Sequence, residues 1–154
     1  MDNEKVIHNF YKAFAKGKAD DMVSYYHQDI VFEDPVFGKL NGEQVKSMWK
    51  MLIERSKGNL KVSFSDIKVV RNSGEAHWEA VYPFGPDKRM VHNKITAEFE
   101  FKDGKIIKHT DSFDLWKWSR MALGWKGILL GWSPMVQNKI KSQSQSLLKK
   151  YMQQ

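Results

Sequence analysis

Residues 91–111 read VHNKITAEFEFKDGKIIKHTD, and their alternation decides the fold class. Every second position from Val91 to Phe101 shares one face of an extended chain, and four of these six residues are large and apolar, which predicts a long, half-buried β-strand. Lys102-Asp103-Gly104 is a hairpin signal. The chain should therefore return as a last strand, from Lys105 to about Leu115.

Upstream of this hairpin the same period of two predicts two more strands, joined by a turn at Asn72-Ser73-Gly74. Nearer the N-terminus apolar residues recur at three- and four-residue steps, which predicts helices over residues 3–16, 20–26 and 42–55. A short β-prone run, 30–32, separates the second helix from the third. Helices followed by four consecutive antiparallel strands indicate an α+β fold.

The composition is that of one globular domain. The chain has 154 residues, of which 42% are hydrophobic, and no cysteine. It can bury one core of ordinary size, and it cannot form a disulfide, a thiolate nucleophile or a thiolate metal site. The N-terminus lacks the basic and apolar segments of a secretion signal, so we expect a cytoplasmic protein.

The net charge of +7 arises entirely at the C-terminal end, where no acidic residue follows Asp114. Residues 116–154 also hold four of the six tryptophans. We expect a basic, helical extension packed on the domain formed by residues 1–115. Its tryptophans should be buried over a pocket mouth or in a dimer interface. Peripheral membrane contact is the alternative, because aromatic and basic residues without acids are typical of interfacial anchors, whereas nucleic-acid binding is not expected.

Two motifs and the order of the elements point to a known family. The run DIVFEDPVFG at 29–38 and the ending DGKIIKHTD at 103–111 resemble the nuclear transport factor 2-like superfamily, most closely its ketosteroid isomerase and SnoaL-like branches. The resemblance covers roughly residues 3–115. It implies a cone: a strongly curved antiparallel sheet, wrapped by N-terminal helices around a hydrophobic pocket, usually in a homodimer.

The resemblance also implies candidate site residues. Asp34 falls at the position of the general base of ketosteroid isomerase, but Phe10 and Ala97 occupy the positions of the tyrosine and the protonated aspartate that form its oxyanion hole. Steroid isomerisation is therefore not expected. Asp111 resembles the last-strand carboxylate proposed as acid or base in SnoaL-like cyclases. The Arg and two Asp of an epoxide hydrolase of this fold are not evident.

We expect Asp34, His109 and Asp111 to form the polar end of the pocket, because residues 109 and 111 share a strand face. Isomerase, cyclase and hydrolase chemistry on a hydrophobic small molecule are all compatible with these groups, without a cofactor or metal. A non-catalytic binding or dimerisation module with a docking tail is the alternative, in which Asp34 only ends a strand and His109 and Asp111 only order the sheet. The pocket wall is expected to comprise Phe10, Phe14, Trp49, Trp78, Tyr82, Asn93 and Ala97.

Overall fold

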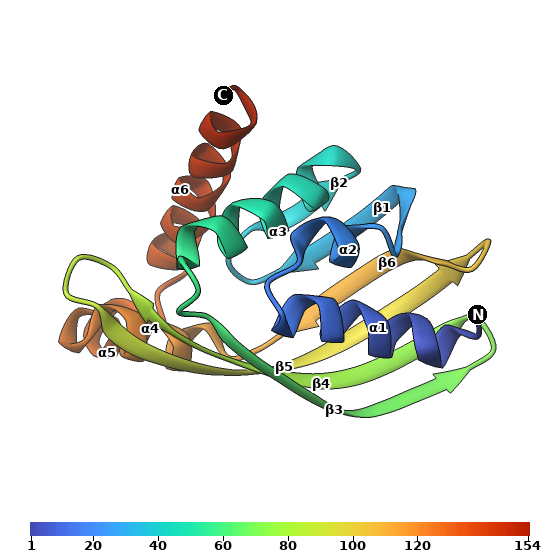
Figure 1. Ribbon diagram of the computed structural model, residues 1–154. Coiled ribbons are helices and arrows are strands. Elements are labelled where there is room, and N and C mark those ends of the chain that lie inside the picture. Colours follow the sequence, from blue (N-terminus) through green and yellow to red (C-terminus); the bar gives the residue numbers. More distant parts are fainter.

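The computed structural model describes residues 1–154 as one curved six-stranded sheet with helices against one face and at one end (Figure 1). The strand order is β2-β1-β6-β5-β4-β3. All neighbouring strands are antiparallel except β1 and β6, which are parallel. The strands are β1 Tyr26–Asp34, β2 Gly38–Asn41, β3 Lys61–Val70, β4 Ser73–Phe84, β5 Arg89–Lys102 and β6 Lys105–Ser112.

Three N-terminal helices cover the inner face of the sheet: α1 Asn3–Ala15, α2 Ala19–Val23 and α3 Glu43–Ser56 (Figure 1). The side chain of Asp2 caps α1 by accepting the backbone N–H of Lys5 at 2.8 Å. The apolar stripe of α1 is fully buried in a core of 26 residues that the sheet and α3 complete. This packing follows directly from the helical period of the sequence.

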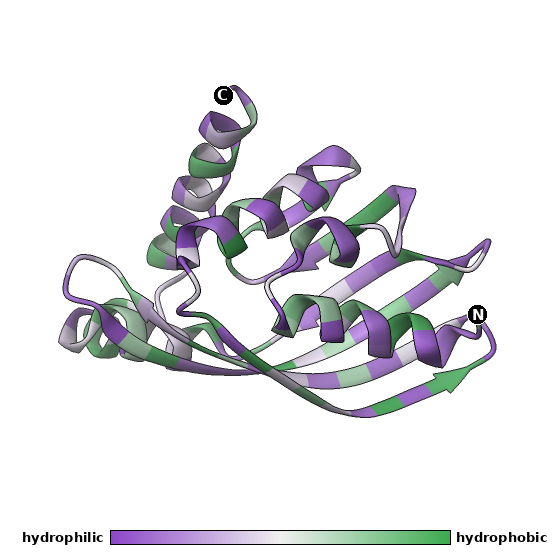
Figure 2. Cartoon of the chain, in the orientation of Figure 1, coloured by the Kyte–Doolittle hydropathy of each residue, from purple (hydrophilic) through white to green (hydrophobic).

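The predicted α+β class and the predicted face of the long strand are both confirmed. In β5 every second residue is buried, and the hydropathy of the strands alternates accordingly (Figure 2). The turn at Asp103-Gly104 connects β5 to β6 as expected, with φ of 54° at Asp103 and 75° at Gly104. The buried face comprises Val91, Asn93, Ile95, Ala97, Phe99 and Phe101.

The prediction of four antiparallel strands was incomplete. β2 was not expected, since its four residues GKLN contain a single large apolar side chain, Leu40. The parallel pairing of Phe32 with His109 joins residues far apart in sequence, which no local period can indicate. Tyr26 was placed at the end of the second helix, but α2 ends at Val23 and Tyr26 begins β1.

The C-terminal residues form α4 Leu115–Leu123, α5 Trp125–Leu130 and α6 Pro134–Met152. Helix α4 packs against β5, and α6 lies beside α3 (Figure 1). A second apolar cluster joins Val91 of β5 to the α4 residues Leu115, Trp118 and Ala122.

Within the single chain, two of the four tail tryptophans are not buried, and their burial in a dimer interface stays a prediction. Trp118 is 5% exposed, whereas Trp125 and Trp132 are 67% and 66% exposed. The difference has a steric reason, because Gly127 of α5 and Gly131 directly after it, and not the large side chains, face α4.

Candidate functional site

A continuous chain of five hydrogen-bonded side chains crosses the interior of the cone. The Trp49 indole N–H donates to the Tyr26 hydroxyl at 2.8 Å, and that hydroxyl lies 2.7 Å from Nδ1 of His109. Nε2 of His109 lies 2.8 Å from Oδ1 of Asp111, which also accepts the Trp78 indole N–H at 3.2 Å. The predicted neighbours His109 and Asp111 are therefore in direct contact on β6.

The two indoles fix the direction of the outer links of the chain, because an indole N–H can only donate. Once the Tyr26 oxygen accepts from Trp49, its own proton is free to be donated to Nδ1 of His109. The imidazole then carries its proton on Nε2 and donates it to Asp111. Neutral His109 and ionised Asp111 thus satisfy every link of the chain.

A carboxyl group at this depth without a lysine or arginine partner is unusual. Asp111 is 3% exposed and His109 is 0% exposed, and the ion pairs of the structure include no lysine or arginine at Asp111. Rings surround the histidine, with centroid distances of 4.6 Å to Phe99, 5.1 Å to Phe32 and 5.7 Å to Phe10. Burying charge without a cation is costly, and such arrangements are concentrated at functional sites.

Asp34 ends β1 on the same face of the sheet. Its Oδ1 accepts the backbone N–H groups of Val36 and Phe37 at 3.0 and 2.6 Å, which closes the turn after Pro35. Burial raises the pKa of Asp34 to about 7, and the negative charge of Asp111 adds to this rise. The two backbone donors and Lys141 oppose it but do not cancel it.

The register of β1 on β6 explains why the two carboxylates interact. Phe32 pairs with His109 and Glu33 with Thr110, so continuing the parallel register by one residue brings Asp34 beside Asp111. Near neutral pH, Asp34 is therefore divided between its protonated and ionised forms beside a second carboxylate. This is the arrangement that lets one group of a pair give a proton and the other accept one.

The hydroxyl of Tyr11 is buried in the same interior and has no hydrogen-bond partner. Its side chain is 0% exposed, and its ring stacks on Phe64 with a centroid distance of 5.5 Å. Burial, and secondarily the charge of Asp111, raises the pKa of Tyr11 well above its ordinary value, so the group stays a neutral phenol. A buried donor without an acceptor can serve a ligand atom.

The C-terminal helices close the end of the cone near Asp34. The Trp118 indole of α4 donates to the Tyr82 hydroxyl at 2.8 Å. Burial raises the pKa of Tyr82, and the charge of Asp34 raises it further. Gln145 of α6 donates its amide to the Phe37 carbonyl at 2.7 Å, directly after the turn that holds Asp34.

The residues expected to line a pocket pack in or at the edge of the core, and the pocket itself stays a prediction. Trp49 lies 5.1 Å from Phe14 and 6.1 Å from Trp78, measured between ring centroids. Phe10, Phe14, Trp49, Trp78, Asn93 and Ala97 are buried, and Tyr82 is partly buried.

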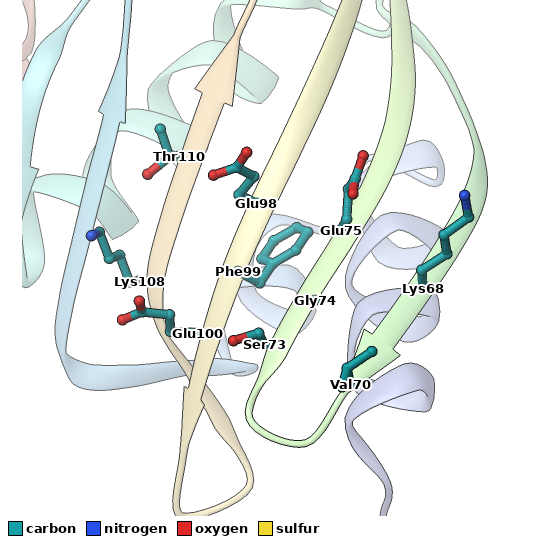
Figure 3. Close-up of a pocket in the computed structure, with 10 residues that line it drawn as sticks. All are labelled: Lys68, Val70, Ser73, Gly74, Glu75, Glu98, Phe99, Glu100, Lys108 and Thr110. Carbon is teal, nitrogen blue, oxygen red and sulfur yellow. The ribbon is translucent and has the colours of Figure 1, made fainter.

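Two surface hollows, of about 430 and 500 Å³, lie away from this interior. The first crosses the outer face of β3 to β6, where Glu75, Glu98, Glu100 and Lys108 surround it (Figure 3). The second lies between α2, α3 and Tyr151. Neither contains Asp34, His109 or Asp111, and the structure has no cluster of three or more histidine and acidic side chains that could hold a metal.

Sequence reasoning named Trp49 and Trp78 only as wall residues and did not name Tyr11 or Tyr26 as site residues. Tyr26, Trp49 and Trp78 were treated as apolar, but each contributes a polar atom to the chain. A usable signal was available, because buried tyrosine and tryptophan usually find a hydrogen-bond partner. Donors therefore do reach the interior, although Phe10 and Ala97 supply none.

Comparisons with known proteins identify a family and a shared fold. The model of the SnoaL-like domain family matches residues 7–109. No curated protein matches the sequence.

Several solved structures share the fold. Bal32a, from a soil-derived mobile gene cassette, has a TM-score of 0.69 at 17% identity, covering 77% of this chain and 95% of its own. A putative polyketide cyclase of Xanthomonas campestris has a TM-score of 0.58 at 19% identity, covering 76% and 93%. An LEH-like epoxide hydrolase of M. tuberculosis has a TM-score of 0.59 at 22% identity, covering 86% and 92%.

Proposed function

Because the chain belongs to the SnoaL-like domain family, we propose that its cone binds a small hydrophobic molecule and catalyses a proton transfer on it. The observation that carries the proposal is the buried Asp111 carboxylate, held by His109 and Trp78 beside the titrating Asp34. The surrounding rings provide an apolar environment in which these groups act strongly on a bound polar atom.

The hydrogen bonds suggest different roles for the three polar residues. Both ring nitrogens of His109 are engaged, with Tyr26 and Asp111, so His109 is a positioning residue that holds the carboxylate. Asp34 accepts both backbone bonds on Oδ1, which leaves Oδ2 to act as base when ionised and as acid when protonated. Tyr11 would donate its unpartnered hydroxyl to an oxygen of the ligand.

We infer the reaction class from the chemistry of these groups and not from the names of the similar solved structures. Proton transfer next to a carbonyl, as in an isomerase or cyclase, needs the base and donor that the site offers. Hydrolysis would in addition need a positioned water. Chemical conversion of a bound ligand would show an enzyme. A binding module would hold the same ligand unchanged.

A ligand screen tests this proposal. We expect some members of a panel of hydrophobic cyclic ketones, phenols and epoxides to raise the melting temperature of the wild-type protein. Tyr11→Phe should raise the free energy of unfolding of the ligand-free protein by about 1 kcal/mol, since it removes an unpartnered buried hydroxyl. The same variant should bind the hits more weakly.

The diagnostic result is a Tyr11→Phe variant that is more stable than the wild type without ligand but shows a smaller ligand-induced rise in melting temperature. Tyr25→Phe is the matched control, because it removes a hydroxyl from a residue that packs at the edge of the core. Equal ligand shifts in wild type and Tyr11→Phe would take Tyr11 out of the site. Equal shifts in wild type and Asp34→Asn would do the same for Asp34.

We also propose a homodimer, as the family resemblance leads us to expect. The outer face of the sheet carries both Glu98 and Lys108 around its hollow, and a surface with both signs of charge can pair with a copy of itself (Figure 3). Light scattering should then give twice the 18.0 kDa of one chain. A mass of one chain at micromolar concentration would contradict this.

A further inference from the structure

Helix α5 and its flanks form an exposed apolar tip, defined here as residues 123–135. Apart from Gly127, every residue of α5 is exposed, and Ile128, Leu129 and Leu130 are 53%, 58% and 53% exposed. Trp125 begins α5, and Trp132 lies two residues after its end. Single exposed apolar residues are ordinary, but seven within thirteen positions are not. The tip comprises the exposed residues Leu123, Trp125, Ile128, Leu129, Leu130, Trp132 and Met135.

The exposure of the tip is built into its packing. Gly127 and Gly131 face α4, where a side chain at either position would overlap Ser119. Glycine at these two places lets the backbones approach closely and turns the large side chains outward. A helix stabilised by burial in its own domain would have the reverse arrangement.

The charge around the tip indicates what covers it. Residues 115–154 contain seven lysines and arginines and no acid. Lys126 lies within the tip. Arg89, the first residue of β5, has its guanidinium beside Gly124 of the tip, and its Nε donates to the Met121 carbonyl at 3.0 Å. Lys88 adds a further cation at the β4–β5 turn, and Asp87 is the acid there. The surrounding field is thus cationic.

We propose that the apolar tip inserts into the interface of a membrane containing anionic lipids. An apolar segment with tryptophans at its ends and lysines beside it matches the polarity profile of that interface. The six residues of α5 span about 9 Å, far short of a bilayer core of about 30 Å. No helix in the structure is long and apolar enough to cross a bilayer, so the contact is peripheral. This inference does not depend on the proposed ligand site.

Vesicle flotation of the full chain tests the proposal. We expect the wild-type protein to float with vesicles of phosphatidylcholine and phosphatidylglycerol at low salt, less with phosphatidylcholine alone, and less again at about 0.5 M NaCl. Ile128→Ser/Leu129→Ser should lower the partition coefficient about tenfold or more, because two side chains lose their burial in the membrane. The double variant keeps all six tryptophans, whose blue shift on binding provides a second readout.

Two matched controls accompany this variant. Val70→Ser/Met152→Ser removes two exposed apolar side chains elsewhere and should bind as the wild type does. Lys126→Glu should weaken binding several-fold, whereas Lys102→Glu makes the same charge change at an exposed position at the end of β5 and should have a smaller effect.

Three results would overturn the proposal. First, the wild type could fail to float with anionic vesicles at low salt. The Ile128→Ser/Leu129→Ser variant could float as well as the wild type. Finally, light scattering without lipid could show that this variant alone loses an association of the wild type, which would make the tip an interface between copies of the chain.

Discussion

The His109→Leu variant is expected to unfold with a free energy about 3 to 5 kcal/mol below that of the wild type. Leucine fills a similar volume, but it leaves the Asp111 carboxylate buried without its imidazole partner. It also removes the acceptor of the Tyr26 hydroxyl. Breaking a buried pair by removing one member is the costly case, because the remaining charge is uncompensated. Urea denaturation monitored by tryptophan fluorescence measures the loss.

A double-mutant cycle makes the result specific. Adding Asp111→Leu should recover a large part of the lost stability, since the buried charge is then gone as well. His77→Leu is the matched control, because His77 lies on β4 with its side chain on the outer, exposed face, and its replacement should cost well under 1 kcal/mol. A loss no larger for His109→Leu than for His77→Leu would contradict the ionised, buried Asp111 proposed above.

Asp34→Asn is expected to stabilise the protein above neutral pH. The pKa of Asp34 is raised from 3.8 to about 7 in the folded state, chiefly by burial, so folding favours its protonated form. Below pH 4 the group is protonated in both states and has no effect on stability. Between pH 4 and 7 only the unfolded state ionises, and the wild type loses stability as the pH rises.

Above pH 7 the wild type has lost the full contribution of this group, about 2 to 4 kcal/mol of unfolding free energy when the partial exposure of Asp34 is taken into account. Asparagine keeps an oxygen for the N–H groups of Val36 and Phe37, so the turn is retained. Unfolding free energies measured from pH 4 to 8 should therefore fall less steeply in Asp34→Asn. Glu33→Gln, on the exposed side of β1, should follow the wild-type curve. Parallel curves for Asp34→Asn and wild type would refute a raised pKa.

These two variants would also separate stability from function. The buried carboxylates of Asp34 and Asp111 are groups that the fold would tolerate better as neutral or apolar residues. Proteins retain such groups where activity requires them, at a cost in stability. A gain in stability together with loss of ligand binding in Asp34→Asn would place Asp34 in the proposed site.

The sequence by itself determined the fold class, the helices and the inner face of β5. It did so because these features depend on periods of 3.6 and 2 that recur within one segment. The same period placed His109 and Asp111 on one face of β6, and the structure finds their side chains 2.8 Å apart. Residues two apart on a strand need no tertiary information to share a side.

The hydrogen-bond partners of those residues depend on the tertiary structure. The contact of His109 with Tyr26 spans 83 positions, and that of Trp78 with Asp111 spans 33. The parallel pairing of β1 with β6, which brings Asp34 beside Asp111, likewise joins segments with no sequence relation that a period could reveal. The raised pKa of Asp34 and the outward tryptophans of the tip arise from burial and close backbone packing. Local sequence sets the direction of a side chain along its own element, whereas its partners and its solvent exposure are set by how distant elements pack.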